Sequence, residues 1–303
     1  IWAARHSSPL ILGLGTGENF VASDIPAFLP FTRQVVFLED HELVHITPNS
    51  WKVFDAHSLQ EVDKDPQHIA WDVQAAQKGG YKHFMLKEIM EQPQVIRDCL
   101  AGRIDAEHGR VVLDEIENLP VPEVIHLVAC GTSYHAGLWA KYLLEKWARI
   151  PVQVDIASEF RYREPILREK DLALTISQSG ETADTLAGLR IAKEQGVKVL
   201  GLCNVLGSSV ARESDAVLYT QAGPEISVAS TKAMCSQMVA LLLLALHWGQ
   251  KRSLMAAEDI HRAVEGLRDI PQIMQAALPG MQERAARLAQ DFSRARSFFY
   301  LGR

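Results

Sequence analysis

The stretch LALTISQSGETADTLAGLR, residues 172–190, indicates how most of this chain folds. It begins as an apolar run, passes through a turn rich in hydroxyl groups, and ends with apolar residues at helical spacing. A buried strand that leads directly into a helix is the repeating unit of a parallel sheet with helices on both faces. The hydrogen-bonding side chains of the turn are those of Ser177, Gln178, Ser179 and Thr182. They follow the predicted strand at its carboxyl end, where open α/β sheets bind their ligands.

The same alternation of strand and helix continues on both sides of this stretch. Strands are predicted at EVIHLVA (123–129), VQVDIA (152–157), LALTIS (172–177), KVLGLCN (198–204) and AVLYT (216–220). Helices are predicted at residues 134–148, in the segment after residue 182, and at residues 228–248. Residues 256–292 are mostly helical and charged, and are expected to lead into a new strand at Phe298. The pattern predicts an α/β fold built on a parallel sheet.

Residues 1–65 have a different character. Their short runs PLILGLG, QVVFLED, ELVHIT and WKVFD are typical of strands separated by turns, which predicts a β-rich domain. Residues 66–82 are polar, contain Pro66 and a glycine pair, and are predicted to form a linker. A helix is predicted at residues 83–100, with Pro93 marking a kink or a break.

Composition excludes several classes of protein. The 303 residues are 48% hydrophobic, which allows a sizeable core, and the net charge of -6 argues against a general nucleic-acid surface. The four cysteines lie far apart without a CxxC pair, which suits a reducing cytosol better than a disulfide framework or a zinc site. The longest apolar run, residues 238–248, is too short to span a bilayer, and no signal peptide is recognised. We therefore expect a cytoplasmic protein that binds neither membrane nor nucleic acid.

Two hydroxyl-rich turns join a predicted strand to a predicted helix: CGTS at residues 130–133 and SQSGET at residues 177–182. Free amides at a helix N-terminus favour an anion, and Gly131 and Gly180 would allow its close approach. A third cluster, SVASTK at residues 227–232, opens the long helix and could close the same pocket. The alternative is that these residues are ordinary N-caps, which serine and threonine favour. Three such turns in one sheet favour a phosphate pocket.

Two other motifs are weaker indications of a functional site. HELVH (41–45) matches a zinc-protease pattern that requires a helix, whereas its flanks predict two strands with residues 39–42 as the turn of a hairpin. GLGTG (13–17) resembles a dinucleotide loop, but Glu18 stands where the third glycine belongs and no helical pattern follows. We expect a structural turn there, and neither a metal nor a cofactor.

Five longer stretches carry a resemblance to a known family: CGTSYHAG, IASEFRYR, SQSGETADTLAGLR, CNVLGSSVARESD and ISVASTKA. Together they resemble the first sugar isomerase (SIS) domain of the glutamine–fructose-6-phosphate aminotransferases (isomerizing). SPLILGLGTGENFVASD resembles the late part of that family's glutaminase domain, and YKHFMLKEIMEQP resembles the start of its isomerase half. The resemblance implies a SIS-type parallel sheet flanked by helices, a flavodoxin-like three-layer sandwich, preceded by a β-rich remnant of an Ntn-type glutaminase domain.

The resemblance divides the chain into four parts. Residues 1–65 form the C-terminal part of the glutaminase domain, and residues 66–82 form a linker. Residues 83–292 form the first SIS domain with its flanking helices, and residues 293–303 form the start of a second SIS domain. It implies that fructose 6-phosphate is aminated and isomerised to glucosamine 6-phosphate, with ammonia from glutamine. The residues implied to hold the phosphate are Ser133, Ser177, Gln178, Ser179 and Thr182. Thr132 would border the sugar, with Val228 and Ser230 near its reacting end. A homodimer through the SIS domains is also implied.

Two departures from the family bear on catalysis. The glutaminase nucleophile is an N-terminal cysteine, and the isomerase glutamate, lysine and histidine lie in the second SIS domain; none is found in this sequence. We therefore expect an internal fragment that holds no catalytic residue and does not turn substrate over by itself. Two rival hypotheses are a sugar-phosphate-sensing regulator with the same fold, and a structural module whose hydroxyl turns are only caps.

Overall fold

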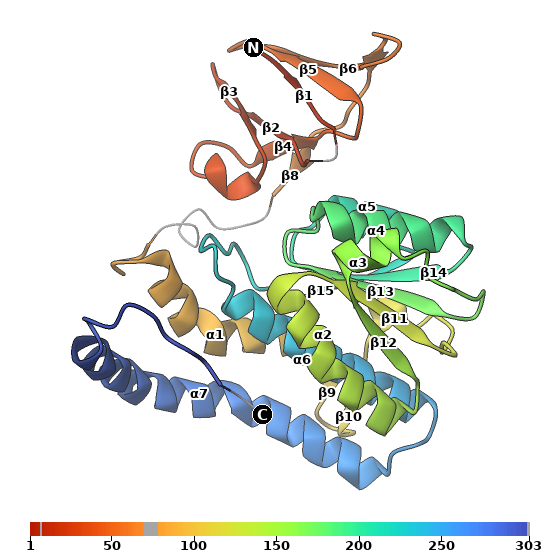
Figure 1. The fold of residues 1–303 in the computed structure, drawn as a ribbon, viewed down its shortest axis with the longest axis vertical. Coiled ribbons are helices and arrows are strands. Elements are labelled where there is room, and N and C mark those ends of the chain that lie inside the picture. The colour runs from red at the N-terminus through yellow and green to blue at the C-terminus, as the bar shows by residue number, and fades with distance from the viewer. Residues whose placement is uncertain (7, 70–77, 302–303) are drawn as a thin grey trace.

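The structure, a computed structural model of residues 1–303, describes all of the chain except residues 7, 70–77 and 302–303 (Figure 1). Residues 70–77 of the predicted linker thus lie outside the described residues. On either side of it the chain forms two parts that lie one above the other in Figure 1, a smaller one of strands and a larger one with a central sheet.

The N-terminal unit, which we define as residues 1–69, consists of two four-stranded antiparallel sheets. One sheet has the order β1 (Trp2–Ala4), β5 (Glu42–Ile46), β6 (Trp51–Asp55), β7 (Glu61–Val62). The other has the order β3 (Asn19–Ala22), β2 (Ile11–Leu14), β4 (Gln34–Phe37), β8 (Gln67–His68), with a short helix η1 (Ile25–Ala27). Leu12 and Val36 of one sheet are buried in a cluster with Val44 and Val53 of the other. The predicted β-rich character is confirmed.

The central sheet has five parallel strands in the order β12 (Val152–Ile156), β11 (Ile125–Ala129), β13 (Leu172–Ser177), β14 (Lys198–Cys203), β15 (Ala216–Tyr219). Numbered along the chain, this order is 2-1-3-4-5, which is the flavodoxin-like arrangement. The order reverses direction between β11 and β13, so that their carboxyl ends form the topological switch point of the sheet. The predicted α/β fold is confirmed.

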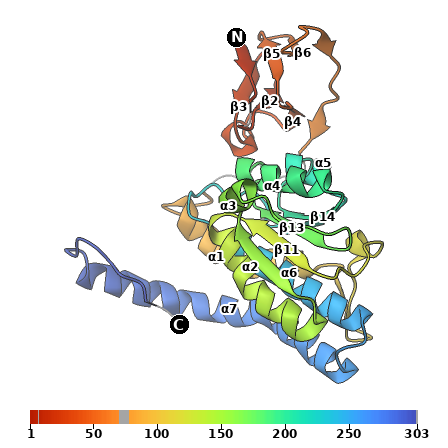
Figure 2. The same ribbon diagram turned by 45° about the vertical axis from the view of Figure 1, so that its right-hand side comes forward.

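Helices cover both faces of the central sheet. One face buries α1 (Phe84–Leu100), α2 (Gly131–Leu143), its π-helical extension (Leu144–Ala148) and α6 (Lys232–Lys251). The other packs against α3 (Ala157–Tyr162), α4 (Ala183–Glu194) and α5 (Ser209–Glu213). Short strands β9 (Ile104–Asp105) and β10 (Arg110–Val111) and the turn η2 (Asp114–Ile116) connect α1 to the sheet. The 35-residue α7 (Ala257–Asp291) projects from the body (Figure 2).

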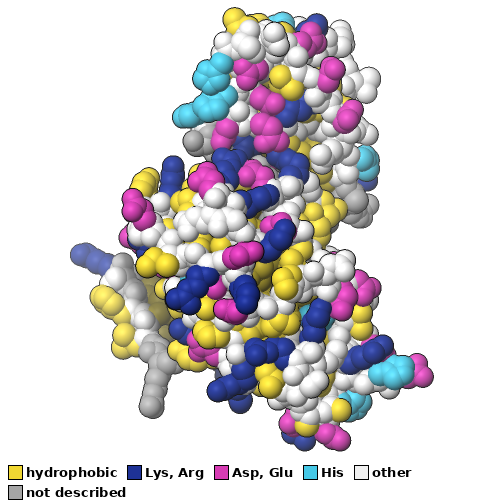
Figure 3. Space-filling view, turned by 90° about the vertical axis from the view of Figure 1, so that its right-hand side faces the viewer, with side chains coloured by type: hydrophobic (Ala, Val, Ile, Leu, Met, Phe, Trp, Pro, Cys, Tyr) yellow, Lys and Arg dark blue, Asp and Glu magenta, His cyan; other side chains and the backbone are white. Residues whose placement is uncertain are grey.

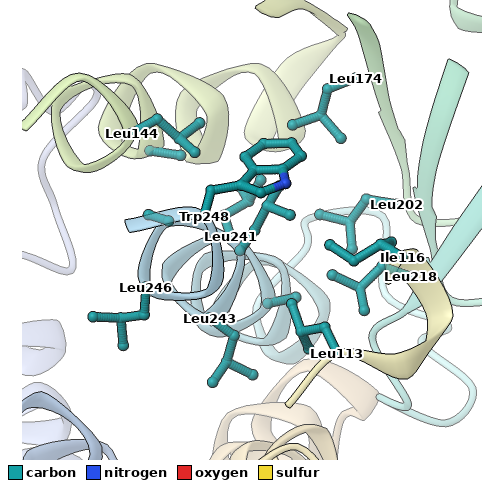
Figure 4. Packing of buried hydrophobic residues seen from close by; sticks show 14 of the residues in the cluster. Leu113, Ile116, Leu144, Leu174, Leu202, Leu218, Leu241, Leu243, Leu246 and Trp248 are labelled. Atoms are coloured by element: carbon teal, nitrogen blue, oxygen red, sulfur yellow. The ribbon is translucent and has the colours of Figure 1, made fainter. Parts of the chain in front are cut away.

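The helix α6 occupies the centre of the larger core. Figure 4 shows Trp248 of α6 among leucines of the sheet and of the α2 extension, including Leu174 and Leu144. By length and composition alone α6 is long and apolar enough to cross a membrane, but 72% of its apolar stretch is buried inside the molecule. The apolar run at residues 238–248 therefore belongs to a helix that is buried in the core.

The structure corrects five local predictions. β4 and β5 belong to different sheets, so the HELVH segment follows a turn between sheets and not a hairpin. α1 continues through Pro93 without a break, α2 begins at Gly131 rather than after the CGTS turn, and α6 begins only at Lys232. The strand expected at Phe298 is absent from the described residues, where the chain up to residue 301 is exposed and irregular. No described strand lies beside this segment to supply the hydrogen bonds that a β-strand needs.

Candidate functional site

The two hydroxyl-rich turns leave the same edge of the sheet from neighbouring strands. Ala129 at the end of β11 pairs with Ile176 in β13, so the residues that follow both strands start at the same level. This edge is the switch point of the sheet, where the connections diverge and open a crevice for ligands. The structure thus brings together Thr132 and Ser133 from one turn with the SQSGET loop, residues 177–182, from the other.

Hydroxyl groups organise the SQSGET loop from within. The Ser177 and Thr182 hydroxyls lie 2.8 Å apart, and the Gly180 amide donates to Ser177 Oγ at 3.0 Å. Ser179 Oγ accepts the Glu181 amide at 3.2 Å. Gly180 has a φ of +68°, a left-handed conformation that glycine adopts without strain. The loop is therefore a compact turn whose remaining donors lie at the amino end of α4.

The capping alternative can be tested on the helices themselves. Cys130 is the N-cap of α2 and Thr182 is the N-cap of α4, and in neither case does the described side chain make a cap hydrogen bond. Thr132 and Ser133 lie inside the first turn of α2, where a side chain is past the capping position. These helix N-termini keep donors for another acceptor, which favours an anion site over simple capping.

The third cluster does not offer its helix N-terminus to a ligand. The Glu225 carboxylate accepts the amides of Thr231 at 2.8 Å and Ala233 at 3.2 Å, and also the Ser230 hydroxyl at 2.9 Å. This carboxylate caps α6 and occupies the place where an anion would bind. Val228 is fully exposed in the preceding loop. An acidic side chain therefore already satisfies the amides of Thr231 and Ala233, and whether residues 227–232 close the pocket of the two hydroxyl-rich turns stays a prediction.

Lys232 is also occupied within the fold. Its ammonium group lies 2.7 Å from Glu91 of α1, and the side chain is only 3% exposed. Glu88 of the same helix accepts the amides of Ile226 and Ser227 at 2.7 and 3.1 Å. Carboxylates of α1 therefore fix the loop before α6. Local sequence patterns do not reveal these contacts, because the partners lie 138 to 141 residues apart.

Cys203 ends the strand next to the SQSGET loop, opposite Ser177 in the register. Burial raises the pKa of its thiol to about 12, against a weaker opposing effect of the Ser208 hydroxyl. The thiol stays protonated at neutral pH and is a poor nucleophile. Cys203 therefore contributes packing beside the loop.

The residues of the two weaker motifs lie in strands and in the turns beside them. His41 has a φ of +66° in the turn before β5, and the His45 ring lies against Trp2 in a tilted contact, with ring centroids 4.5 Å apart. Among the residues that the structure describes, no group of three histidine, cysteine or acidic side chains could hold a metal ion. Gly17, with a φ of +75°, makes the turn between β2 and β3, as expected for a structural loop. Cavities of about 350 and 330 Å³ near His45 and His247 are lined by neither hydroxyl loop.

Comparison with known families agrees with this geometry. Residues 122–247, which span the central sheet and both hydroxyl loops, match the family model of the SIS domain. This part of the chain is therefore a SIS domain.

The proteins that it resembles throughout are the glutamine–fructose-6-phosphate aminotransferases (isomerizing). It is 50% identical to that of Caldanaerobacter subterraneus subsp. tengcongensis and 46% identical to that of Thermus thermophilus, in each case over the whole chain. The chain spans about half the length of these curated relatives. A solved C-terminal domain of glucosamine-fructose-6-phosphate aminotransferase from Francisella tularensis is 42% identical, with a TM-score of 0.66 over 72% of this chain and 62% of that one.

Proposed function

We propose that this chain provides the sugar-phosphate-binding SIS domain of a glutamine–fructose-6-phosphate aminotransferase. The whole protein would make glucosamine 6-phosphate from fructose 6-phosphate, by amino transfer and ketose–aldose isomerisation, with glutamine as the source of ammonia. The observation that carries the proposal is the meeting of two hydroxyl-rich loops, each opening an uncapped helix, at the switch point of the sheet. No feature of the described residues favours the alternative of a sugar-phosphate-sensing regulator with the same fold.

The proposed phosphate ligands are Ser133, Ser177, Gln178, Ser179 and Thr182. Hydroxyl and amide donors can hold a phosphate without a lysine, because helix N-termini supply partial positive charge. Thr132, exposed at the start of α2, would border the sugar. Val228 and Ser230 would lie toward its reacting end, on the loop that Glu88 and Glu225 hold in place. Anchoring the remote phosphate would orient the reacting carbons.

The proposed organisation has four parts. Residues 1–65 belong to a glutaminase domain, and residues 66–82 form a linker. Residues 83–292 form the first SIS domain, and residues 293–303 form the start of a second SIS domain. The two antiparallel sheets and the five-stranded parallel sheet support the first and third of these. We place the catalytic groups outside this chain, since its SQSGET loop holds one carboxylate, Glu181, which faces Ser209. The four cysteines form no disulfide, which suits a cytoplasmic enzyme.

We also propose a homodimer through the SIS domains. Three exposed apolar side chains lie on this side of the sheet: Ile156 at the end of the edge strand β12, Tyr162 at the end of α3, and Ile166 in the loop that follows. Apolar groups gathered on a surface mark sites of association. Light scattering of the wild type and of a Tyr162→Asp, Ile166→Asp variant tests this, because a dimer through this surface would dissociate on adding two charges. An unchanged mass for the variant would exclude this surface.

Calorimetric titration with fructose 6-phosphate tests the main proposal. Ser179→Ala and Thr182→Ala should each weaken binding by roughly 1.5–3 kcal/mol, because each removes a donor to a charged acceptor. Fructose without the phosphate is the control ligand and should bind far more weakly to the wild type. Unchanged affinity in both variants, with unchanged thermal stability, would contradict a phosphate site in this loop.

A further inference from the structure

The SQSGET loop is held from behind by the segment that follows β14. The Gln178 carbonyl accepts the Asn204 amide at 3.1 Å, and the Gly180 carbonyl accepts the Val210 amide at 2.9 Å. The Glu181 carboxylate accepts both the amide and the hydroxyl of Ser209, at 2.7 and 2.9 Å. Glu181 is buried, so its side chain points into the protein and away from the ligand edge.

A residue from the N-terminal unit completes this support. Arg5, which follows β1 and is 2% exposed, places Nη2 3.4 Å from Glu181 Oε2 and 3.3 Å from Ser209 Oγ. Its other nitrogens contact the Leu38 carbonyl and, at 3.4 Å, the Asp40 carboxylate. One buried guanidinium therefore joins the turn between β4 and β5 to the back of the SQSGET loop.

More exposed ion pairs surround this buried contact. Arg190 lies 3.1 Å from Asp40, and Arg212 lies 2.8 Å from Glu39. Figure 3 shows basic and acidic side chains gathered where the N-terminal unit meets the rest of the molecule. Pairs at the surface contribute little, whereas a buried charge that loses its partner is costly. The Arg5–Glu181 pair is thus the electrostatic contact on which the junction depends most.

We propose that Glu181 is a positioning residue for the anion site, and that Arg5 couples this site to the docking of the N-terminal unit. The inference rests on the proposed function of the SQSGET loop. Glu181 lies between Ser179 and Thr182, so a displacement of its backbone moves both hydroxyls. If docking fixes Glu181, docking tightens anion binding, and by linkage a bound anion must tighten docking equally.

The direction in which one substitution changes the affinity for phosphate distinguishes a positioning role of Glu181 from a simple electrostatic effect. Glu181→Gln keeps the shape of the side chain and an acceptor for the Ser209 amide, but removes a negative charge close to the anion. Electrostatics alone predicts that a phosphate dianion binds this variant more tightly. Positioning predicts weaker binding, because the neutral amide no longer pairs with Arg5.

The experiment titrates inorganic phosphate and fructose 6-phosphate into the 303-residue chain. The variants are Glu181→Gln, Arg5→Met and the double variant, with Arg190→Gln as the control because Arg190 bridges the same two parts without touching Glu181. We expect each single variant to bind phosphate roughly five-fold or more weakly, the double variant to be no worse than either, and the control to match the wild type. Tighter or unchanged binding by Glu181→Gln overturns the inference.

Hydrogen exchange supplies a readout that a purely structural role would not move. Saturating phosphate should slow amide exchange in residues 34–42 of the N-terminal unit in the wild type and the control, but not in Glu181→Gln or Arg5→Met. Protection that persists in these variants would show that coupling does not pass through the pair. A wild type that binds neither ligand would overturn both the inference and the proposed function, whereas normal wild-type binding without the variant effects overturns the inference alone.

Discussion

At the scale of single residues, position 180 requires glycine, both because of its backbone conformation and because of the atoms that surround it. A Cβ atom built there would lie 2.0 Å from Ser208 Oγ. Gly196 also has a positive φ, of +77°, but a Cβ there would meet nothing within 4 Å. Gly196→Ala should lower the free energy of unfolding by about 1 kcal/mol, the cost of a left-handed alanine. Gly180→Ala should cost roughly 1–3 kcal/mol more, because Ser208 must move.

Urea unfolding of the two variants measures this difference. Fructose 6-phosphate affinity should fall only in Gly180→Ala, since Gly196 lies at the far end of α4. Equal losses of stability would show that Ser208 yields without cost.

His247, in the last turns of α6, predicts a pH dependence. Burial lowers the pKa of its imidazole below 6.5, while Glu117 opposes this shift. The unfolded chain therefore takes up the proton first as the pH falls, so the free energy of unfolding decreases below about pH 6.5. Replacing the histidine by glutamine should flatten this dependence below about pH 6.5.

Urea unfolding at several pH values measures the slope. His68→Gln, an exposed position in β8, is the control and should keep the wild-type slope. A slope unchanged in His247→Gln would assign the pH dependence to other groups.

At the scale of elements, two helical glycines predict opposite effects of the same substitution. A Cβ at Gly137 of α2 would lie 2.3 Å from Leu127 of β11, whereas one at Gly266 of α7 would meet nothing within 4 Å. Gly266→Ala should raise the free energy of unfolding by roughly 0.5–1 kcal/mol, because alanine favours the helix. Gly137→Ala should lower it despite the same propensity, because the buried Leu127 side chain or α2 must shift in a packed core. Thermal melts compare the two variants, and a stabilised Gly137→Ala would mean that α2 is loosely packed.

The sequence predicted best the elements whose pattern is complete within a short window. LALTIS and WKVFD are strands over the predicted residues, since each is an apolar or alternating run bounded by turn residues. The short helices α3 and α5 were missed, because one or two turns carry no periodicity to recognise. The start of α6 was misjudged because Glu225, which caps it, lies outside the window that local rules consider.

At the scale of the whole molecule, the two parts share an apolar contact. Val205, after β14, is buried in the same cluster as Ile11, Phe28 and Phe37 of the N-terminal unit. We therefore expect a single calorimetric unfolding transition. Val205→Asp should split it in two, because a buried unpaired charge opposes docking more than it disturbs either core. Leu206→Asp, at a side chain that is 51% exposed, is the control and should leave one transition. Two transitions in the wild type would show that the parts unfold independently.

The candidate site could be predicted only in part, because local sequence patterns do not reveal tertiary contacts. The hydroxyl loops were found because Ser177, Gln178, Ser179 and Thr182 stand within six positions and follow a recognisable strand. The residues that hold these loops in place are not near them in the sequence. Arg5, Glu88 and Glu225 reach their partners through tertiary contacts, for which a single sequence contains no local signal.

The pairing of Arg5 with Glu181 also has a consequence for biosynthesis. The two residues are 176 positions apart, so Arg5 leaves the ribosome long before its partner is made. At the usual rates of translation, roughly 5–20 residues per second, the interval is on the order of ten to thirty seconds. During that time the sheets of the N-terminal unit can form, but the guanidinium has no buried carboxylate of the later part to meet and stays hydrated. Docking is therefore a late event in the life of the nascent chain, and it waits for the fold that surrounds the SQSGET loop.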